Sequence, residues 1–155
     1  MSVPDDEVVA ALLGRKPQGA YQVIVRDPAG TPVVIENSPL LDDGTPMPTT
    51  FWLLSGDIHY RVSQLESAGG VDRAEEAVGL NAIAIAHDTY RVAREAKIQP
   101  GHEGSLPSGG VGGTRTGVKC LHAHMAWWLA GGTDPVGDWV AAELGITRPV
   151  NGVTQ

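Results

Sequence analysis

The sequence predicts one α+β domain, in which a small, mostly antiparallel three-stranded sheet packs with four to five helices. Residues that favour strands are concentrated in three short runs before residue 55. After residue 57, apolar residues recur mainly at helical spacing. Because the strands form one unit ahead of most of the helices, the class is α+β. A chain of 155 residues is long enough for one domain with a buried core.

The first part of the chain holds one helix and the three strands. Asp5 or Asp6 is a candidate cap for a helix that ends at Gly14 and carries an apolar stripe. Strands are expected at 21–25, 32–36 and 51–54, with a turn at 27–30 and an irregular, proline-rich stretch at 37–50. We assign residues 1–19 to an N-terminal helix and linker, 20–146 to the α+β domain, and 147–155 to a frayed tail.

Helices are expected to fill the rest of the chain. Apolar spacing predicts one over 57–67 and a long one over 72–97, which Gly79 could divide. The middle of the long helix, 82–86, is apolar nearly all round and predicts a central position. Glycine and proline make 99–113 irregular. Further helices are expected over 118–130 and 138–144, the second after a turn at Asp134 and Pro135.

Composition narrows the class of partner and the compartment. The formal net charge of −7 argues against nucleic acid, which selects basic surfaces. One cysteine cannot form an internal disulfide, and this is typical of a reducing compartment. The N-terminus is acidic, and no apolar run approaches the roughly 20 residues that span a bilayer. We therefore expect a cytoplasmic protein that does not bind membranes.

The glycine-rich loop before the 118–130 helix is the first candidate site. Its glycines let backbone N–H groups converge, the helix adds its positive end, and two basic side chains add full charges. This combination predicts a site for a small anionic ligand that bears a phosphate or carboxylate, within residues 109–124. The pattern matches neither a P-loop nor a dinucleotide fingerprint. The alternative is a flexible loop with solvated basic residues. The expected ligand-binding residues are Gly112, Gly113, Thr114, Arg115 and Lys119.

The second candidate site consists of Cys120, His122 and His124. In this alternative, the protein is a small metal- or thiol-dependent enzyme that uses these three residues together with His87. On a regular helix Cys120 and His124 share a face, whereas an extended segment would align all three. A zinc ion would need ligands from elsewhere, with His87 and Asp88 ahead of His59 or His102. The alternative is that the cysteine and the histidines are buried, structural residues. Spacing alone does not decide between an enzyme and a binding protein.

Two other readings of this stretch use its basic residues and its tryptophans. Cys120 near a helix start and basic residues could have a lowered pKa and act as a nucleophile. Trp127, Trp128 and Trp139 could belong to the core, or could form an exposed apolar surface for a protein partner. That second reading would make the protein a non-catalytic interaction module.

The run from Gly109 to Gly137 resembles the signature of the bacterial domain-of-unknown-function family 501, DUF501. The blocks 44–53 and 62–66 resemble its other recognisable part, so the likeness covers most of 20–144. The resemblance implies a family and no particular activity. Family members commonly carry cysteines where this chain has Asp27 and Ser55. If those cysteines bind a metal together with Cys120, two thiolates are missing here, which weakens the zinc hypothesis for this chain.

Overall fold

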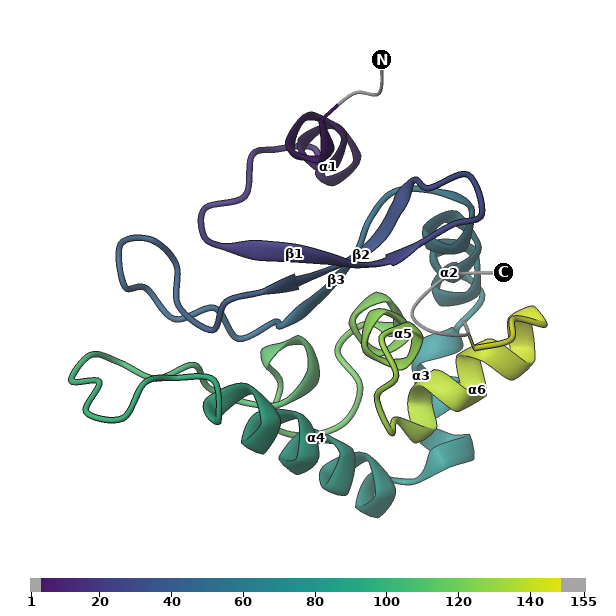
Figure 1. Ribbon diagram of the computed structural model, residues 1–155. Coiled ribbons are helices and arrows are strands. Elements are labelled where there is room, and N and C mark those ends of the chain that lie inside the picture. The colour runs from purple at the N-terminus through teal and green to yellow at the C-terminus, as the bar shows by residue number, and fades with distance from the viewer. Residues whose placement is uncertain (1–3, 149–155) are drawn as a thin grey trace.

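The computed structural model describes residues 4–148, so most of the tail predicted at 147–155 lies outside the described residues. The α+β class is confirmed, with one three-stranded antiparallel sheet (Figure 1). The described residues form α1 (Asp5–Leu13), β1 (Tyr21–Arg26), β2 (Pro32–Asn37), β3 (Phe51–Leu53), α2 (Asp57–Ser67), α3 (Gly70–Val78), α4 (Leu80–Glu95), the 3-10 turn η1 (Val111–Gly113), α5 (Leu121–Leu129) and α6 (Pro135–Leu144).

The described residues contain six α-helices, one more than the upper expectation, because Gly79 divides the long helix predicted over 72–97. Gly79 has φ 90°, in the left-handed region that glycine adopts at little cost. Its N–H bonds Glu75 O and ends α3, while its carbonyl accepts the N–H of Ile83 in α4. Gly79, the residue at which the sequence predicted that the long helix could divide, is therefore where the helix axis changes direction.

The sheet separates α1 from the other helices (Figure 1). Strand order is β1-β2-β3, and Val34 of β2 pairs with Leu53 of β3. Neighbouring residues on a strand point to opposite faces. Val34 and Leu53 accordingly join the main core with the helices, whereas Ile35 packs with Val9 of α1. In this order β3 pairs only with β2, so its other edge has no neighbouring strand within residues 4–148.

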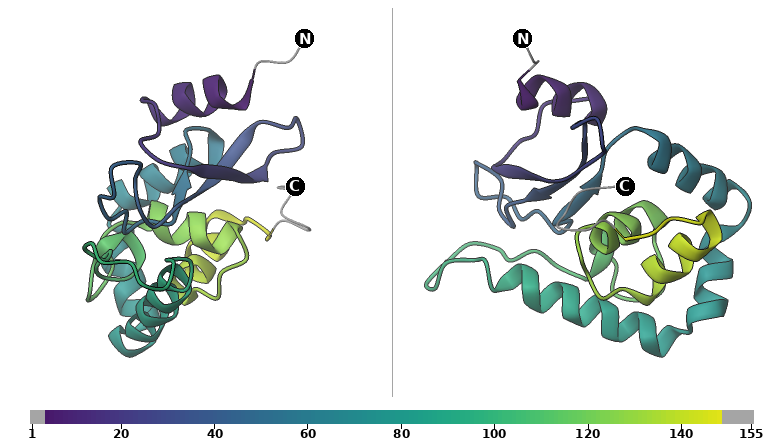
Figure 2. Two further views of the ribbon diagram at one scale, coloured as in Figure 1. Left: turned by 60° about the vertical axis from the view of Figure 1, so that its left-hand side comes forward. Right: turned by 45° about the vertical axis from the view of Figure 1, so that its right-hand side comes forward.

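The central helix is α5, not the 82–86 stretch for which that position was predicted. Leu121 and all residues from Ala123 to Leu129 are buried, and α5 lies below the sheet, where it contacts β3, α6 and α2 (Figure 2). In α4 only one side faces the core, and Ile85 is 68% exposed. Two apolar segments look alike in sequence, and tertiary packing decides which one is enclosed.

Besides α3, which begins at Gly70 rather than Asp72, three helix starts differ from the prediction. The helix predicted from Val118 begins at Leu121, because Glu75 and Glu66 bind the N–H groups of Val118 and Leu121 and hold this segment outside the helix. The last helix begins at Pro135 rather than Asp138, with Asp134 as its cap. In α1 the cap is Pro4. Asp5 and Asp6 lie in the first turn, where negative charge favours the positive helix end.

A buried arginine holds the long loop at 99–113 against α4. The Arg94 side chain is fully buried, and its guanidinium donates to the carbonyls of Pro48, Pro107 and Gly109 at 2.9, 3.3 and 2.9 Å. These carbonyls belong to two separate loops. Arg94 therefore joins both loops to one helix, and it fixes where the glycine-rich segment begins.

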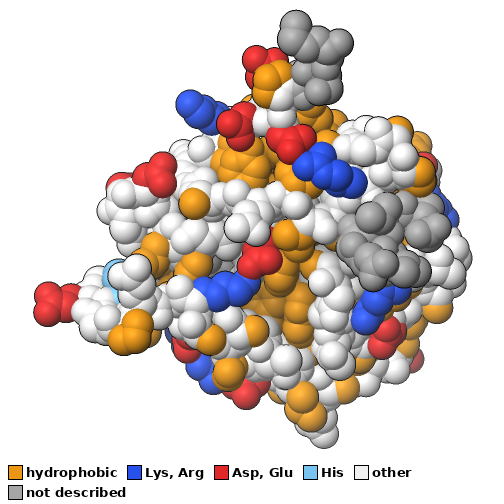
Figure 3. Space-filling view, in the orientation of Figure 1, with side chains coloured by type: hydrophobic (Ala, Val, Ile, Leu, Met, Phe, Trp, Pro, Cys, Tyr) orange, Lys and Arg blue, Asp and Glu red, His pale blue; other side chains and the backbone are white. Residues whose placement is uncertain are grey.

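None of the helices described here combines the length and the apolar character that crossing a membrane requires. On the face shown in Figure 3, the described Lys and Arg side chains are interspersed with Asp and Glu, and apolar side chains lie between the sheet and the helices below it. The described residues therefore form no continuous basic area on this face.

Candidate functional site

The structure divides the predicted catalytic residues into two separate groups. His122 and His124 are two residues apart on α5, so they point about 200° apart around its axis. His124 lies beside His87 of α4, with ring centroids 5.9 Å apart. His122 lies beside Cys120 and residues of α2. The four side chains predicted to share one site therefore do not meet in a single cavity.

The first group is sealed in the core. His124 and Asp134 are both fully buried, and His124 Nδ1 lies 2.6 Å from Asp134 Oδ2. The other Asp134 oxygen accepts the N–H of Val136 and caps α6. Among the described residues, His124 Nε2 has no hydrogen-bond partner. This pair ties α5 to α6, and it offers no surface at which a substrate could bind.

His87 holds the glycine-rich loop through both of its ring nitrogens. Val111 N–H donates to Nδ1 at 3.0 Å, and Nε2 donates to Gly117 O at 2.7 Å. These bonds require the neutral ring with its proton on Nε2. Burial lowers the pKa of His87, and the nearby His124 lowers it further, against the effect of the Gly117 bond. Neither nitrogen is free for proton transfer or for a metal.

The loop itself turns its N–H groups inward. Gly110 N–H donates to Thr114 O at 2.7 Å, and Gly113 N–H donates to Gly110 O at 3.0 Å. Gly110 fits so closely against α4 that a Cβ there would lie 2.4 Å from the Cβ of His87. The glycines thus serve close packing and tight turning, and these two N–H groups do not converge on an anion as expected.

Arg115 and Lys119 line different pockets. Arg115 borders a pocket of about 460 Å³ beside α4. Lys119 borders a pocket of about 330 Å³ at the free edge of β3, which we name the β3–α5 pocket; it is lined by Leu13, Arg15, Thr49, Phe51, Trp52, Leu53, Gly112, Lys119, Cys120, His122 and Ala123. The expected pairing of Arg115 with Lys119 in one cavity is therefore wrong.

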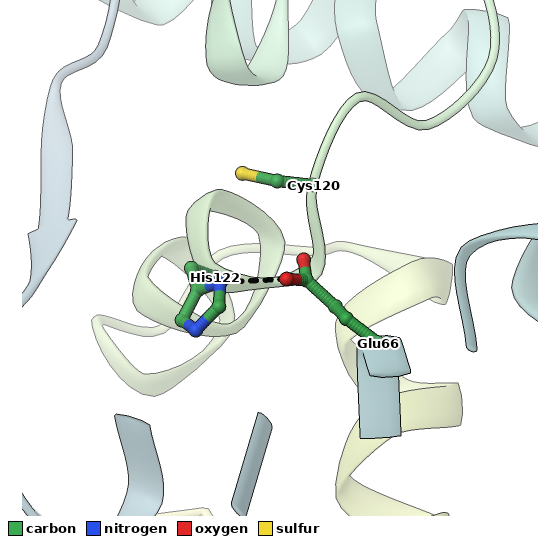
Figure 4. A group of neighbouring side chains, drawn as sticks. All are labelled: Glu66, Cys120 and His122. Carbon is green, nitrogen blue, oxygen red and sulfur yellow. Dashed lines mark ion pairs between the residues drawn. The ribbon is translucent and has the colours of Figure 1, made fainter. Parts of the chain in front are cut away.

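The second group brings together Glu66, Cys120 and His122 (Figure 4). One ligand atom from each lies within 4.8 Å of the other two. Cys120 is the extended residue just before α5, with φ −151° and ψ 150°, so it is not on the helix that carries His122. A regular helix through both residues would hold these two side chains apart, whereas the extended Cys120 lets them meet. His87 and Asp88, the expected additional ligands, are not in this group.

Hydrogen bonds fix the orientation of His122. Ser63 Oγ donates to the His59 carbonyl at 3.0 Å, so its one proton is used. Ser63 Oγ therefore accepts from His122 Nε2 at 2.9 Å. The other nitrogen, Nδ1, faces Glu66 Oε1 at 3.3 Å. The His59 ring lies 4.3 Å from the His122 ring, and burial and then His122 lower the pKa of His59.

The start of α5 already holds two acidic partners. Glu66 Oε2 accepts Leu121 N–H at 2.6 Å, and Glu75 Oε1 accepts Val118 N–H at 2.7 Å. Burial raises the pKa of the Cys120 thiol, although the N–H groups of Ala123 and His122 oppose the rise. The lowered pKa that a nucleophilic cysteine would need is therefore not supported.

Comparison with known proteins agrees with the signature described from the sequence. Residues 23–142 match the family model described as "Protein of unknown function (DUF501)". The chain belongs to the DUF501 family. No curated protein and no solved structure gave a match. In this DUF501 protein, Asp27 and Ser55, the positions where the resemblance leads us to expect cysteines, line one pocket of about 190 Å³ together with His59.

Three residues were missed from the sequence: Arg15, which lines the β3–α5 pocket, and Ser63 and Glu66, which contact His122. A usable signal existed for two of them. His59, Ser63 and Glu66 recur at i, i+4 and i+7 and so share one face of α2. Arg15 follows the end of α1, and only the tertiary fold places it over Trp52, 5.2 Å from the ring centroid.

The tryptophans do not form an exposed surface. Trp127 and Trp128 are each 6% exposed and belong to the core, and Trp139 packs partly buried against it. Trp128 also donates to Asp138 at 2.7 Å. The interaction-module hypothesis was based on these three tryptophans, and in the structure they lie in the core or pack against it.

Proposed function

We propose that this DUF501 protein binds a small anionic ligand in the β3–α5 pocket. One observation carries the proposal: the pocket is lined by two basic side chains, Arg15 and Lys119, and by no carboxylate. Neither side chain forms an ion pair with any described residue. Charged donors of this kind form strong hydrogen bonds to phosphate and carboxylate oxygens.

The larger pocket beside α4 is a poorer anion site on charge grounds. It contains Arg115 and Arg91, but Asp88 and Glu95 also line it. Both carboxylates pair with Arg91, at 2.7 and 3.0 Å. Two acidic groups offset the two basic ones there. The proposal therefore keeps Lys119 and Gly112 from the expected ligand-binding set, and it leaves out Gly113, Thr114 and Arg115.

The pocket walls indicate what else the ligand carries. Leu13, Phe51, Trp52 and Leu53 supply apolar surface next to the basic residues. Pockets of this kind bind molecules that bury an apolar part while a few polar groups fix their orientation. We therefore favour a ligand with one phosphate or carboxylate group on an apolar body over a bare inorganic anion.

Calorimetric titration with phenyl phosphate and with benzoate tests the proposal and shows whether the pocket prefers a phosphate or a carboxylate ligand. Replacing Lys119 by Gln should weaken binding by roughly 1.5–3 kcal/mol, the value of a hydrogen bond to a charged group. Lys16→Gln removes the same charge from a residue outside the pocket and should leave affinity unchanged. Equal affinity in the Lys119→Gln, Arg15→Gln and unmodified proteins would refute the proposal.

A further inference from the structure

We propose that Glu66, Cys120 and His122 form a binding site for a divalent transition-metal ion of the zinc type. The proposal stands on the geometry of these three side chains and does not depend on the anion pocket. Within residues 4–148, no other set of three His, Cys, Asp or Glu residues brings its ligand atoms this close. Cys120 and His122 also line the β3–α5 pocket, so a fourth coordination position would face it.

The distances suit a single ion after small side-chain rotations. The three ligand atoms lie within 4.8 Å of one another. Zinc binds sulfur, nitrogen and oxygen at about 2.0–2.3 Å, which places tetrahedral ligand atoms about 3.3–3.8 Å apart. His122 Nδ1 and Glu66 Oε1 are already 3.3 Å apart. The third ligand, Cys120, is the extended residue before α5, and its sulfur lies within 4.8 Å of a ligand atom of each of the other two residues.

The hydrogen bonds around His122 favour a cation between it and Glu66. Because Ser63 Oγ fixes the Nε2 proton, the neutral ring turns the Nδ1 lone pair toward the Glu66 carboxylate. Two acceptors at this distance repel each other unless a proton or a metal ion lies between them. A histidine that binds a metal through one nitrogen and donates from the other to a fixed acceptor is the usual arrangement in metal sites.

Glu66 is likewise oriented to bind the metal ion through only one of its two carboxylate oxygens. Its Oε2 is held by Leu121 N–H at 2.6 Å, which leaves Oε1 facing His122. On binding, the Cys120 thiol would lose its proton to solvent and its sulfur would bond the ion, so one proton leaves for each ion bound. Thiolate and imidazole ligands select zinc, cobalt and similar ions over magnesium or calcium.

Titration of the full, reduced chain with Co²⁺ tests this site, since a thiolate bound to Co²⁺ gives a charge-transfer band in the near ultraviolet. We expect one ion per chain, with the band displaced by Zn²⁺. Cys120→Ser should abolish the band. Glu66→Gln and His122→Gln should weaken Co²⁺ binding by roughly tenfold or more, and Ser63→Ala by roughly tenfold with the band retained.

His102→Gln is the matched control, because it removes a histidine from the loop at 99–113, outside the cluster. It should leave the band and the affinity unchanged. Absence of the band, or equal Co²⁺ affinity in the Glu66→Gln, His122→Gln and unmodified proteins, would overturn the proposal; circular dichroism checks that each variant is folded. The titration contains no phosphate, and the phenyl phosphate titration is run with chelator, so either proposal can fail alone.

Discussion

Glu66 on α2 accepts the N–H of Leu121 at 2.6 Å, and this contact sets where α5 begins. The carboxylate supplies the negative charge that a helix start favours, a role more often filled by a side chain just before the helix. Cys120 stays extended as a result and reaches the same side as His122. The cluster thus depends on a contact between two segments that are distant in sequence.

Removing the Glu66 carboxylate should destabilise the protein more than replacing it by a neutral amide. Glu66→Ala leaves the Leu121 N–H without its acceptor and should lower the free energy of unfolding by about 1–2 kcal/mol, the cost of losing a helix cap. Glu66→Gln keeps an oxygen acceptor and should lose clearly less. Urea unfolding of the two variants checks this, and equal losses would show that the Leu121 bond contributes little.

Arg94 should be among the most sensitive positions on α4. Arg94→Met leaves the buried carbonyls of Pro48, Pro107 and Gly109 without their donor, and we expect a loss of about 2–4 kcal/mol. Arg91→Met is the control on the same helix. Its ion pairs are partly exposed at the surface, so this substitution should destabilise the protein clearly less than Arg94→Met. Denaturant midpoints that fall equally in both variants would contradict this role for Arg94.

Acid should loosen the glycine-rich loop through His87. Burial lowers the pKa of His87 in the folded protein, so the unfolded chain binds more protons at this residue. Its contribution to stability is therefore present above about pH 6.5, and it is lost as the pH falls toward the lowered pKa. Protonated Nδ1 can no longer accept the Val111 N–H.

Hydrogen exchange at the Val111 amide, corrected for the intrinsic effect of pH, is the local measurement for this change. Protection should fall between pH 7 and pH 5. Unfolding experiments should show a flatter dependence of stability on pH in His87→Gln than in the unmodified protein, whereas His102→Gln should keep the original slope. If His87→Gln kept the full slope, His87 would not be the titrating group.

The helices and strands could be predicted from local sequence patterns, whereas the segment that becomes buried in the core could not. β-forming residues placed the three strands, and the spacing of Ile58, Val62 and Leu65 placed α2 with its observed bounds. Periodicity could not distinguish α5 from the 82–86 stretch, since both are apolar nearly all round. Which of them becomes the core depends on tertiary packing.

The candidate site shows the same limit. The sequence identified Cys120, His122 and Lys119, but it joined them to His87, His124 and Arg115, which the fold directs elsewhere. That grouping assumed a helix from Val118. Carboxylates from α2 and α3 prevent it, and no local pattern reveals contacts between segments more than 40 residues apart.

Amide NMR spectra recorded during a phenyl phosphate titration give the most direct test of the proposed binding site. If the β3–α5 pocket binds the anion, the largest shifts will be at Gly112, Lys119 and Trp52, and they will disappear in the Arg15→Gln, Lys119→Gln double variant. Shifts confined to Ser108–Gly110 and Arg115, which line the pocket beside α4, or no saturable shifts at all, would contradict the proposal.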